Sequence, residues 1–435
     1  MLAAWGQGAE AVAGTQAGEA VAQVWAYGSF GKPGKVVEQK LIENPGFQCF
    51  RFANGVVVNF KQTKFAPNKV EVRAHFGVGR REVDKRDYVA AELGQTLLVA
   101  GGLGRHRISA LQAMFATSGV LDFTMGMGPE SFAISTSTFS GSLDEQLEVL
   151  AAYMTDPGFD PSLDGRISAS VDLIYRTLLT QPSAAVSIAL IDAAAPEAAS
   201  RMPPREVMAA IRSADFARVL KPILTTAPIE LTIVGDVDQA TAISAIASTF
   251  GALPARPATA RAKGDPSFTR YPDKAPPLIR AEHDGPADTA AATMIWPLYV
   301  STPERRREEY AIKLLAAVFD TALRQRIREE LGKTYAPSVS SVGPDHGDQG
   351  VLQVGFEAGA KDLDTLIEEA RAIAAKLAAG NITASMLQNA RQPLVASAGS
   401  LRQSNLWWAG AMGGSARQPA ILQELLEYDT LMNAV

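Results

Sequence analysis

Predicted strands and helices occur in the same order on either side of a proline-rich segment, and this repetition limits the fold more than any other feature. The first stretch predicts strands at 47–52, 56–60 and 70–76, a helix at 88–99, a helix from Ser109, strands at 120–125 and 131–139, and helices at 143–154 and 166–179. The second predicts a strand at 289–296, a helix at 303–331, strands at 335–342 and 351–357, and helices at 363–379 and 383–400. An internal duplication of about 200 residues is the simplest explanation.

These elements are predicted from hydrophobic periodicity and turn residues. The strands 47–52 and 56–60 alternate around Asn54-Gly55, a pair that accepts the positive φ of a tight hairpin. The helix at 88–99 has apolar residues at helical spacing and ends at a glycine-rich break. Strands that alternate with helices and include antiparallel hairpins predict an α+β fold, in which helices cover one face of a sheet in each of two homologous domains.

Composition divides the chain into four parts. Residues 1–35 are rich in Ala, Gly and Gln and are expected to be poorly structured, whereas residues 36–253 form the first domain. Residues 254–277 contain six prolines and predict an extended linker, because proline fixes φ and removes a hydrogen-bond donor. Residues 278–435 form the second domain. A closing strand equivalent to 229–234 would fall about 20 residues beyond Val435, so we expect a second domain truncated at its C-terminus and a chain that is a fragment.

Charge and hydropathy exclude several classes of protein. The 41 Lys and Arg against 46 Asp and Glu give a net charge of −5 without a basic block, which argues against a nucleic-acid binder. No apolar run reaches the roughly 18 residues of a membrane-spanning helix. The first basic residue is Lys32, so the N-terminus lacks the basic start of a secretory signal. The single cysteine, Cys49, excludes an internal disulfide and has no cationic setting.

Histidines are too few and too dispersed for a hydrolytic zinc site. The chain has four, His75, His106, His283 and His346, and no two lie one helical turn apart. We therefore expect no metal bound by this chain. A serine nucleophile elbow is absent, and the glycines at 101–104 follow a helix and lack the ending of a phosphate-binding loop.

The most informative segment runs from Ile327 to Tyr335. Its helix is predicted to end at Gly332, so that Arg328 in the last turn and Tyr335 at the entry of the next strand approach each other. A guanidinium and a phenol brought together could hold a peptide carbonyl or the oxyanion formed from it. The alternative is a solvated Arg328, favoured by the helix dipole, and a core aromatic Tyr335. The residues themselves leave both open.

The same segment resembles the Arg/Tyr element of the insulinase/pitrilysin family of zinc metallopeptidases. Further stretches are similar to the second half of the double-length bacterial members: 27–34, 52–56, 76–80, 235–238, 249–254 and the region around 405–408. In that family one half carries His-x-x-Glu-His and binds zinc, and the other lacks the metal. At the corresponding helix, Ala91 and Gln95 stand where the histidines would be and Gly94 where the glutamate would be. The resemblance is therefore to the non-zinc half.

The resemblance implies a function for this half. Zinc is expected in a His-x-x-Glu-His-bearing partner half or subunit, whose glutamate activates water. This chain would close over a peptide, with Arg328 binding a carbonyl and Tyr335 donating to the oxyanion. The double-length relatives imply a periplasmic location, with the cytoplasm as the alternative. The other reading of the chain is a non-catalytic structural or peptide-holding protein of the same fold.

Overall fold

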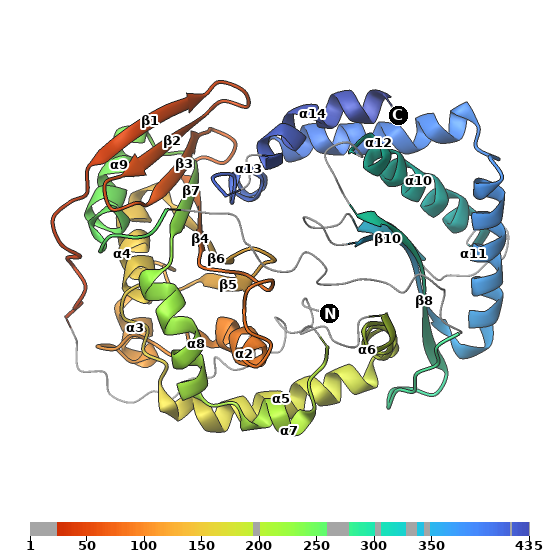
Figure 1. Ribbon diagram of the computed structural model, residues 1–435, viewed down its shortest axis with the longest axis horizontal. Coiled ribbons are helices and arrows are strands. Elements are labelled where there is room, and N and C mark those ends of the chain that lie inside the picture. The colour runs from red at the N-terminus through yellow and green to blue at the C-terminus, as the bar shows by residue number, and fades with distance from the viewer. Residues whose placement is uncertain are drawn as a thin grey trace.

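The computed structural model describes residues 24–194, 201–258, 278–300, 306–327, 337–342, 349–417 and 420–434. It contains two sheets, each with its own helices (Figure 1). The mixed α+β class predicted from the sequence is confirmed. Among the described helices, none combines the length and the apolar composition that crossing a membrane requires.

The first domain is built on a seven-stranded sheet of order β1-β2-β3-β7-β4-β6-β5. Its strands are β1 (Val36–Ile42), β2 (Phe47–Phe52), β3 (Val57–Gln62), β4 (Lys69–Phe76), β5 (Phe123–Met127), β6 (Phe132–Phe139) and β7 (Ile229–Gly235). Its helices are α2 (Tyr88–Leu97), α3 (Ile108–Met114), α4 (Leu143–Tyr153), α5 (Asp164–Thr180), α6 (Pro182–Ala194), α7 (Arg205–Ala210), α8 (Ser213–Thr226) and α9 (Gln239–Ser248). Only the β3–β7 pair is parallel; the other neighbours are antiparallel.

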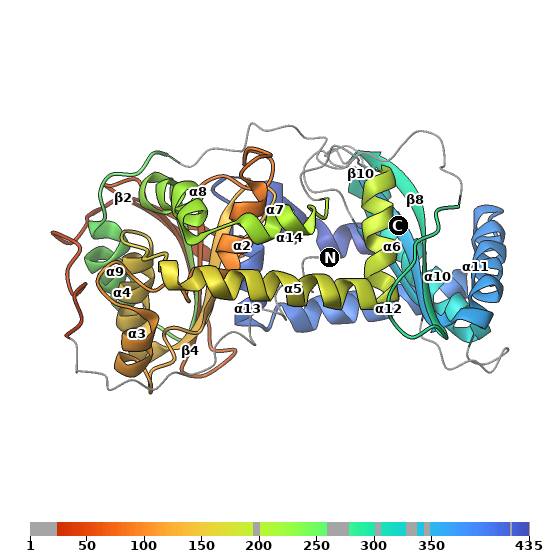
Figure 2. The ribbon, with the colours of Figure 1, turned by 90° about the horizontal axis from the view of Figure 1, so that it is seen from below.

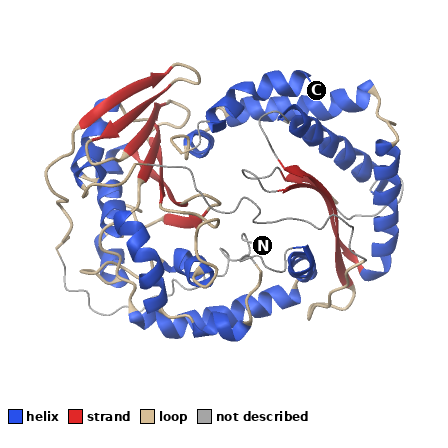
Figure 3. Ribbon diagram, in the orientation of Figure 1, coloured by secondary structure: helices blue, strands red, loops and turns tan. Residues whose placement is uncertain are grey.

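The second described sheet has three antiparallel strands in the order β8-β10-β9. Its elements are β8 (Thr289–Val300), α10 (Arg306–Gln325), β9 (Ser338–Val342), β10 (Gln349–Gly359), α11 (Leu363–Ala378) and α12 (Ala384–Leu401). Helices α10 and α11 lie on the outer side of this sheet (Figure 1; helices are blue in Figure 3). The helices α13 (Asn405–Met412) and α14 (Ala420–Ala434) complete the described chain.

Most predicted elements are confirmed, and the exceptions have local causes. The Asn54-Gly55 hairpin forms, with Gly55 at a φ of 92°. The strand predicted at 120–125 instead covers 123–127, because Asp122 donates its N–H to Gly119 O at 3.0 Å and so belongs to a turn. Strand β1 was not predicted: it is an edge strand without a buried residue, so it has no apolar pattern.

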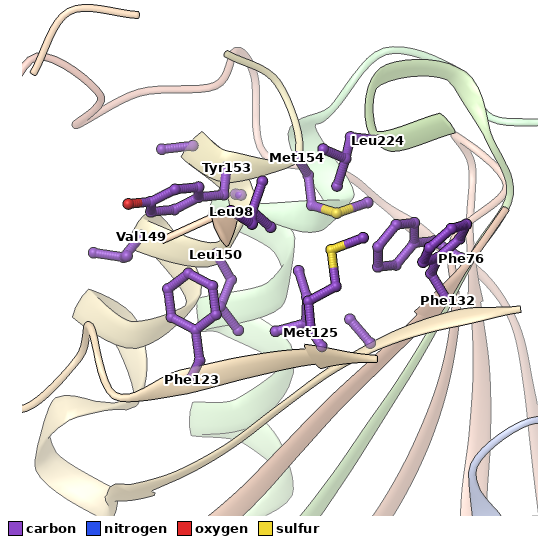
Figure 4. Close-up of a cluster of buried hydrophobic side chains, with 14 of the residues drawn as sticks. Phe76, Leu98, Phe123, Met125, Phe132, Val149, Leu150, Tyr153, Met154 and Leu224 are labelled. Atoms are coloured by element: carbon purple, nitrogen blue, oxygen red, sulfur yellow. The ribbon is translucent and has the colours of Figure 1, made fainter. Parts of the chain in front are cut away.

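The first core lies between the sheet and the helices α2, α4, α8 and α9. Phe76 and Phe132 stack with ring centroids 5.9 Å apart, and Phe123 meets the ring of Tyr153 edge-on at 5.1 Å (Figure 4). Inward-facing residues alternate along the strands; in β4, for example, every second residue is buried. This alternation follows from the two-residue period of a strand and places the helix layer on one face.

Helices from each half of the chain also pack against the other half. Helix α5 runs along one side of the molecule toward the second sheet, and α6, which follows it, packs against the inner side of β8 (Figure 2). On the opposite side, α12 leads back to α13, which packs against β4 and β7 of the first sheet. The second face of the first sheet is therefore partly covered, and β7 is buried at all seven positions.

Two segments expected to be irregular have described parts that pack on the first domain. Residues 24–35 form no helix or strand, yet Tyr27 is buried and donates to Asp156 Oδ2 at 2.7 Å. In the proline-rich segment, Arg256 is buried and its Nη1 donates to Leu224 O at 2.9 Å. Residues 1–23 and 259–277 lie outside the described residues.

Candidate functional site

The two residues predicted to carry the chemistry, Arg328 and Tyr335, lie outside the described residues. The structure describes the chain on both sides of them. Helix α10 and the turn that follows it reach Ile327, which is fully buried in the second core, and β9 begins at Ser338. The roles assigned to Arg328 and Tyr335 from the sequence therefore stay predictions.

Helix α2 carries Ala91, Gly94 and Gln95, the three positions at which the resemblance noted in the sequence would place a zinc motif. Ala91 is fully buried in the first core, so its position faces hydrophobic side chains. A Cβ added at Gly94 would lie 2.7 Å from Leu220 Cδ1 and 3.1 Å from Phe216 Cδ1. Helix α8, which carries those two residues, thus packs directly against α2 where a catalytic glutamate would need space.

Gln95, at the second histidine position, takes part in a local hydrogen bond. Its Nε2 donates to Glu92 Oε2, and Glu92 Oε1 lies 3.4 Å from the hydroxyl of Tyr88. Glu92 is buried, and burial raises its pKa, although Arg80 and the two hydrogen bonds oppose the shift. Zinc requires three or four protein ligands, and α2 offers one carboxylate bound to its own neighbours. These residues do not fit a metal ion.

The three histidines that the structure describes serve local structure. His75 Nδ1 lies 3.1 Å from Ser131 Oγ, and His106 Nε2 accepts the N–H of Ala26 at 3.1 Å. His283 Nδ1 accepts from Gly285 N at 3.1 Å. Within the described ranges, His, Cys, Asp and Glu side chains form no group of three or more that could hold a metal. His346 lies outside those ranges.

Cys49 lies in β2 and is partly buried. Burial raises the pKa of its thiol, and the charges of Glu230 and Glu38 add to this effect. The thiol is therefore kept protonated near neutral pH, which is unfavourable for nucleophilic attack.

The sequence did not predict how the C-terminal part of the second domain would dock on the first. We call residues 404–417 the C-terminal arm; they contain α13 and the turn after it. The arm lies on the face of the first sheet opposite the helix layer, where Trp408, Ala409 and Met412 pack against Phe47 and Val234. The ring of Trp408 also receives Lys61 Nζ, 4.4 Å from its centroid.

Under the arm lies a buried polar cluster centred on Glu230 of β7. Glu230 is fully buried, and its Oε1 accepts from Asn59 Nδ2 at 2.8 Å and from Ala416 N at 3.0 Å. Asn59 Nδ2 also lies 3.2 Å from Met412 O. Burial raises the pKa of Glu230, while its hydrogen bonds and the charge of Arg417 counteract the shift. A carboxylate inside an apolar strand was the one signal in the sequence for this contact.

The described residues therefore form two sheet-and-helix halves, in which no cluster of His, Cys, Asp and Glu side chains is arranged to hold a metal. The two halves of the chain contact each other in two places: α6 packs on β8, and the C-terminal arm packs on β4 and β7.

Comparison with known proteins gives a family model that matches part of the chain and solved structures that share its fold. Residues 214–394, from α8 to α12, match the family model described as the peptidase M16 inactive domain. A search among curated protein sequences finds no match. Among solved structures, the periplasmic protease PqqL from Escherichia coli shares 17% identity and a TM-score of 0.77 over 98% of this chain. This chain spans 47% of that protease, or about half its length.

Two further structures have the same fold. The ferredoxin protease FusC, solved in complex with Arabidopsis ferredoxin, is 14% identical with a TM-score of 0.74, over 98% of this chain and 46% of its own. A peptidase M16 inactive domain from Pseudomonas fluorescens is 17% identical with a TM-score of 0.65, over 89% of this chain and 91% of its own. Residues 214–394 thus match the peptidase M16 inactive domain, and the chain shares its fold with these three structures.

Proposed function

We propose that this chain is the non-zinc half or subunit of a zinc metalloendopeptidase and acts together with a half that carries His-x-x-Glu-His. The observation that carries the proposal is the match to the M16 inactive domain, together with the residues at Ala91, Gly94 and Gln95, which do not fit a metal. Since the chain spans about half of the double-length relatives, the other half would supply zinc as the Lewis acid.

In this proposal the chain's own contribution comes from Arg328 and Tyr335. The Arg328 guanidinium would hold a carbonyl of the bound peptide, because its fork of N–H donors fixes an acceptor in direction as well as distance. The Tyr335 hydroxyl would donate a hydrogen bond to the oxyanion that develops on the attacked carbonyl. Loss of one such donor typically costs about 10²–10³ in kcat. The compartment in this proposal is the periplasm, as for PqqL.

The experiment mixes the purified chain with a His-x-x-Glu-His-bearing partner and zinc, and follows cleavage of an unfolded peptide. Neither component alone is expected to turn over. Tyr335→Phe should lower kcat by about 10²–10³, and Arg328→Ala should mainly raise KM. Arg371→Ala is a matched control, because Arg371 forms only an exposed ion pair with Glu368 on α11.

Unchanged turnover in both Arg328→Ala and Tyr335→Phe would show that the assigned roles are wrong. Stable assembly or peptide binding without zinc-dependent turnover, in every partner mixture, would support the alternative of a non-catalytic structural or peptide-holding protein. A neighbouring reading frame that encodes His-x-x-Glu-His would favour the peptidase.

A further inference from the structure

Strand β1 leaves one edge of the first sheet open. Among the described strands it pairs only with β2, and Figure 1 shows it at the outer margin of the first domain. Six of its seven residues are exposed and the seventh is partly exposed. Val37 and Leu41 have exposed fractions of 62% and 58%. Apolar side chains on an open edge of this length favour pairing with a further strand.

The direction of the backbone groups along β1 follows from the turn to β2. Ile42 O accepts the N–H of Gly46 at 3.1 Å across this turn, so the backbone groups of Ile42 point toward β2. Backbone groups alternate in direction along a strand. Those of Lys40 therefore also point toward β2, whereas those of Gln39 and Leu41 point outward. Gln39, the middle residue of β1, thus presents its N–H and C=O at the open edge.

The order of the side chains in β1 is self-complementary about Gln39. From residue 36 to residue 42 the strand reads Val-Val-Glu-Gln-Lys-Leu-Ile. If two copies pair antiparallel with Gln39 opposite Gln39, Glu38 of each copy lies directly opposite Lys40 of the other. Val37 then lies opposite Leu41. Opposite charges and apolar side chains at directly opposed positions stabilise antiparallel strands. The two Gln39 residues would exchange both of their backbone hydrogen bonds, which requires the outward direction that these groups have.

The adjacent registers of the same pairing are unfavourable. An axis at Lys40 would place the two Lys40 side chains opposite each other, and an axis at Glu38 would do the same for the two carboxylates; like charges directly opposite destabilise a strand pair. Lys40 is exposed and makes no ion pair within the described part of the chain. Glu38 lies 2.6 Å from Arg51 Nη2, and both side chains are 54% exposed, so its carboxylate can accept a second cation. The register shift between β1 and β2 lies before Glu38, so residues 38–42 pair regularly.

We propose that two copies of this chain form a dimer by antiparallel pairing of their β1 strands about a two-fold axis at Gln39, so that the two first sheets become continuous. The same surface is used on both copies, so the assembly closes at two. The inference goes beyond the proposed function and uses none of its residues. One strand pair is a small interface, and we expect a reversible dimer with a dissociation constant on the order of 10⁻⁵ M.

Sedimentation velocity of the full chain, at concentrations from about 1 to about 300 µM, tests the dimer. We expect the weight-average mass to rise from that of one chain to that of two and no further. In Lys40→Glu, carboxylates of the two copies would face each other at both charge pairs, so the dissociation constant should rise about tenfold or more. The matched control is Lys221→Glu, which makes the same change of charge at an exposed position of α8 and should leave association unchanged.

A mixture of two variants tests the register of the pairing. Glu38→Lys alone should also weaken association, because ammonium groups then face each other at both charge pairs. When Lys40→Glu and Glu38→Lys are mixed in equal amounts, each carboxylate of one copy faces an ammonium group of the other. The heterodimer should therefore be about tenfold tighter than the homodimer of either variant. Such a recovery also shows that neither variant had lost association by misfolding.

Three results would overturn the proposal. A chain that stays monomeric over the whole range of concentrations would refute the dimer and leave the β1 edge open to a strand of a different protein. Equal effects of Lys40→Glu and Lys221→Glu would refute a role of β1 in association. A mixture that associates no better than its two components would refute the antiparallel pairing about Gln39.

Discussion

Arg417 Nη1 donates a hydrogen bond of 2.7 Å to the backbone carbonyl of Gly77, a residue 340 positions earlier in the chain. Its Nη2 lies 3.3 Å from Pro228 O. The arginine is 7% exposed and stands at the end of the C-terminal arm, where the second half of the chain returns to the first sheet. The two halves are therefore joined by buried polar contacts in addition to the helices that cross between them.

Loss of the Arg417 guanidinium should destabilise the chain. In Arg417→Met one buried and one partly buried carbonyl lose their donor, and Glu230 loses the positive charge that partly compensates its burial. We expect the free energy of unfolding to fall by about 2–4 kcal/mol. Urea titration followed by tryptophan fluorescence measures it, since Trp407 and Trp408 lie in the arm.

The control for this variant is Arg371→Met, at an exposed ion pair, which should cost less than about 0.5 kcal/mol. Equal effects of the two substitutions would mean that the arm does not depend on Arg417.

His75 should make the fold sensitive to acid. Burial lowers the pKa of His75 to about 3, and the charges of Arg73 and Arg417 add to the shift. Between pH 6.5 and about 3 the unfolded chain binds a proton that the folded chain does not, so this contribution to stability is complete above pH 6.5 and is lost as the pH falls. Relative to His75→Gln, the native chain should lose about 2 kcal/mol between pH 7 and pH 5.

The comparison with His75→Gln is needed because Glu230 acts in the opposite sense. Its raised pKa means that the folded chain holds the proton more tightly, so its contribution is present at low pH and lost as the pH rises through the shifted value. Unfolding curves measured in urea at pH 5, 6 and 7 give the difference. If the free energy of unfolding of the native chain and of His75→Gln changes equally between pH 7 and pH 5, His75 is not held neutral by burial.

Restoring the family's zinc motif on α2 should fail. In the triple variant Ala91→His/Gly94→Glu/Gln95→His, the new glutamate would collide with Leu220 and Phe216, and the first histidine would replace a fully buried alanine. We expect a loss of about 3 kcal/mol or more and no stoichiometric zinc binding.

Thermal unfolding and zinc titration by calorimetry measure the two effects. Gln95→His alone is the control, because Gln95 is only partly buried and this change should cost less than about 1 kcal/mol. A triple variant that folds normally and binds one zinc ion would contradict the packing of α8 against α2.

The segment before β1 should contribute to stability through Tyr27. Tyr27→Phe removes the bond to Asp156 Oδ2 and the acceptor of Arg105 N, which lies 3.0 Å from the hydroxyl. Since both partners lie on the first domain, we expect the free energy of unfolding, measured by urea titration, to fall by about 1–2 kcal/mol. Ser187→Ala, which removes a hydroxyl bonded along its own helix, is the control. No loss in Tyr27→Phe would place residues 24–35 outside the cooperative unit.

The sequence by itself determined most of the local elements. The Asn54-Gly55 turn specified a hairpin because only a few residues accept its φ, and alternation along β4 and β6 specified the buried face. Ala91, Gly94 and Gln95 were enough to predict a half without zinc, since metal ligation depends on residue type. Arg328 and Tyr335 remain predictions from the motif.

Only the tertiary structure decided how the halves engage. Strand β1 has no apolar pattern, because an edge strand needs only backbone hydrogen bonds to one neighbour. Glu230 and Arg417 are compatible with solvent when read along the chain, and are buried because the arm returns to the sheet. Such contacts join residues far apart in the chain, and no local period encodes them. Arg326 and Glu369, 43 positions apart, likewise meet only because the turn after α10 packs near α11.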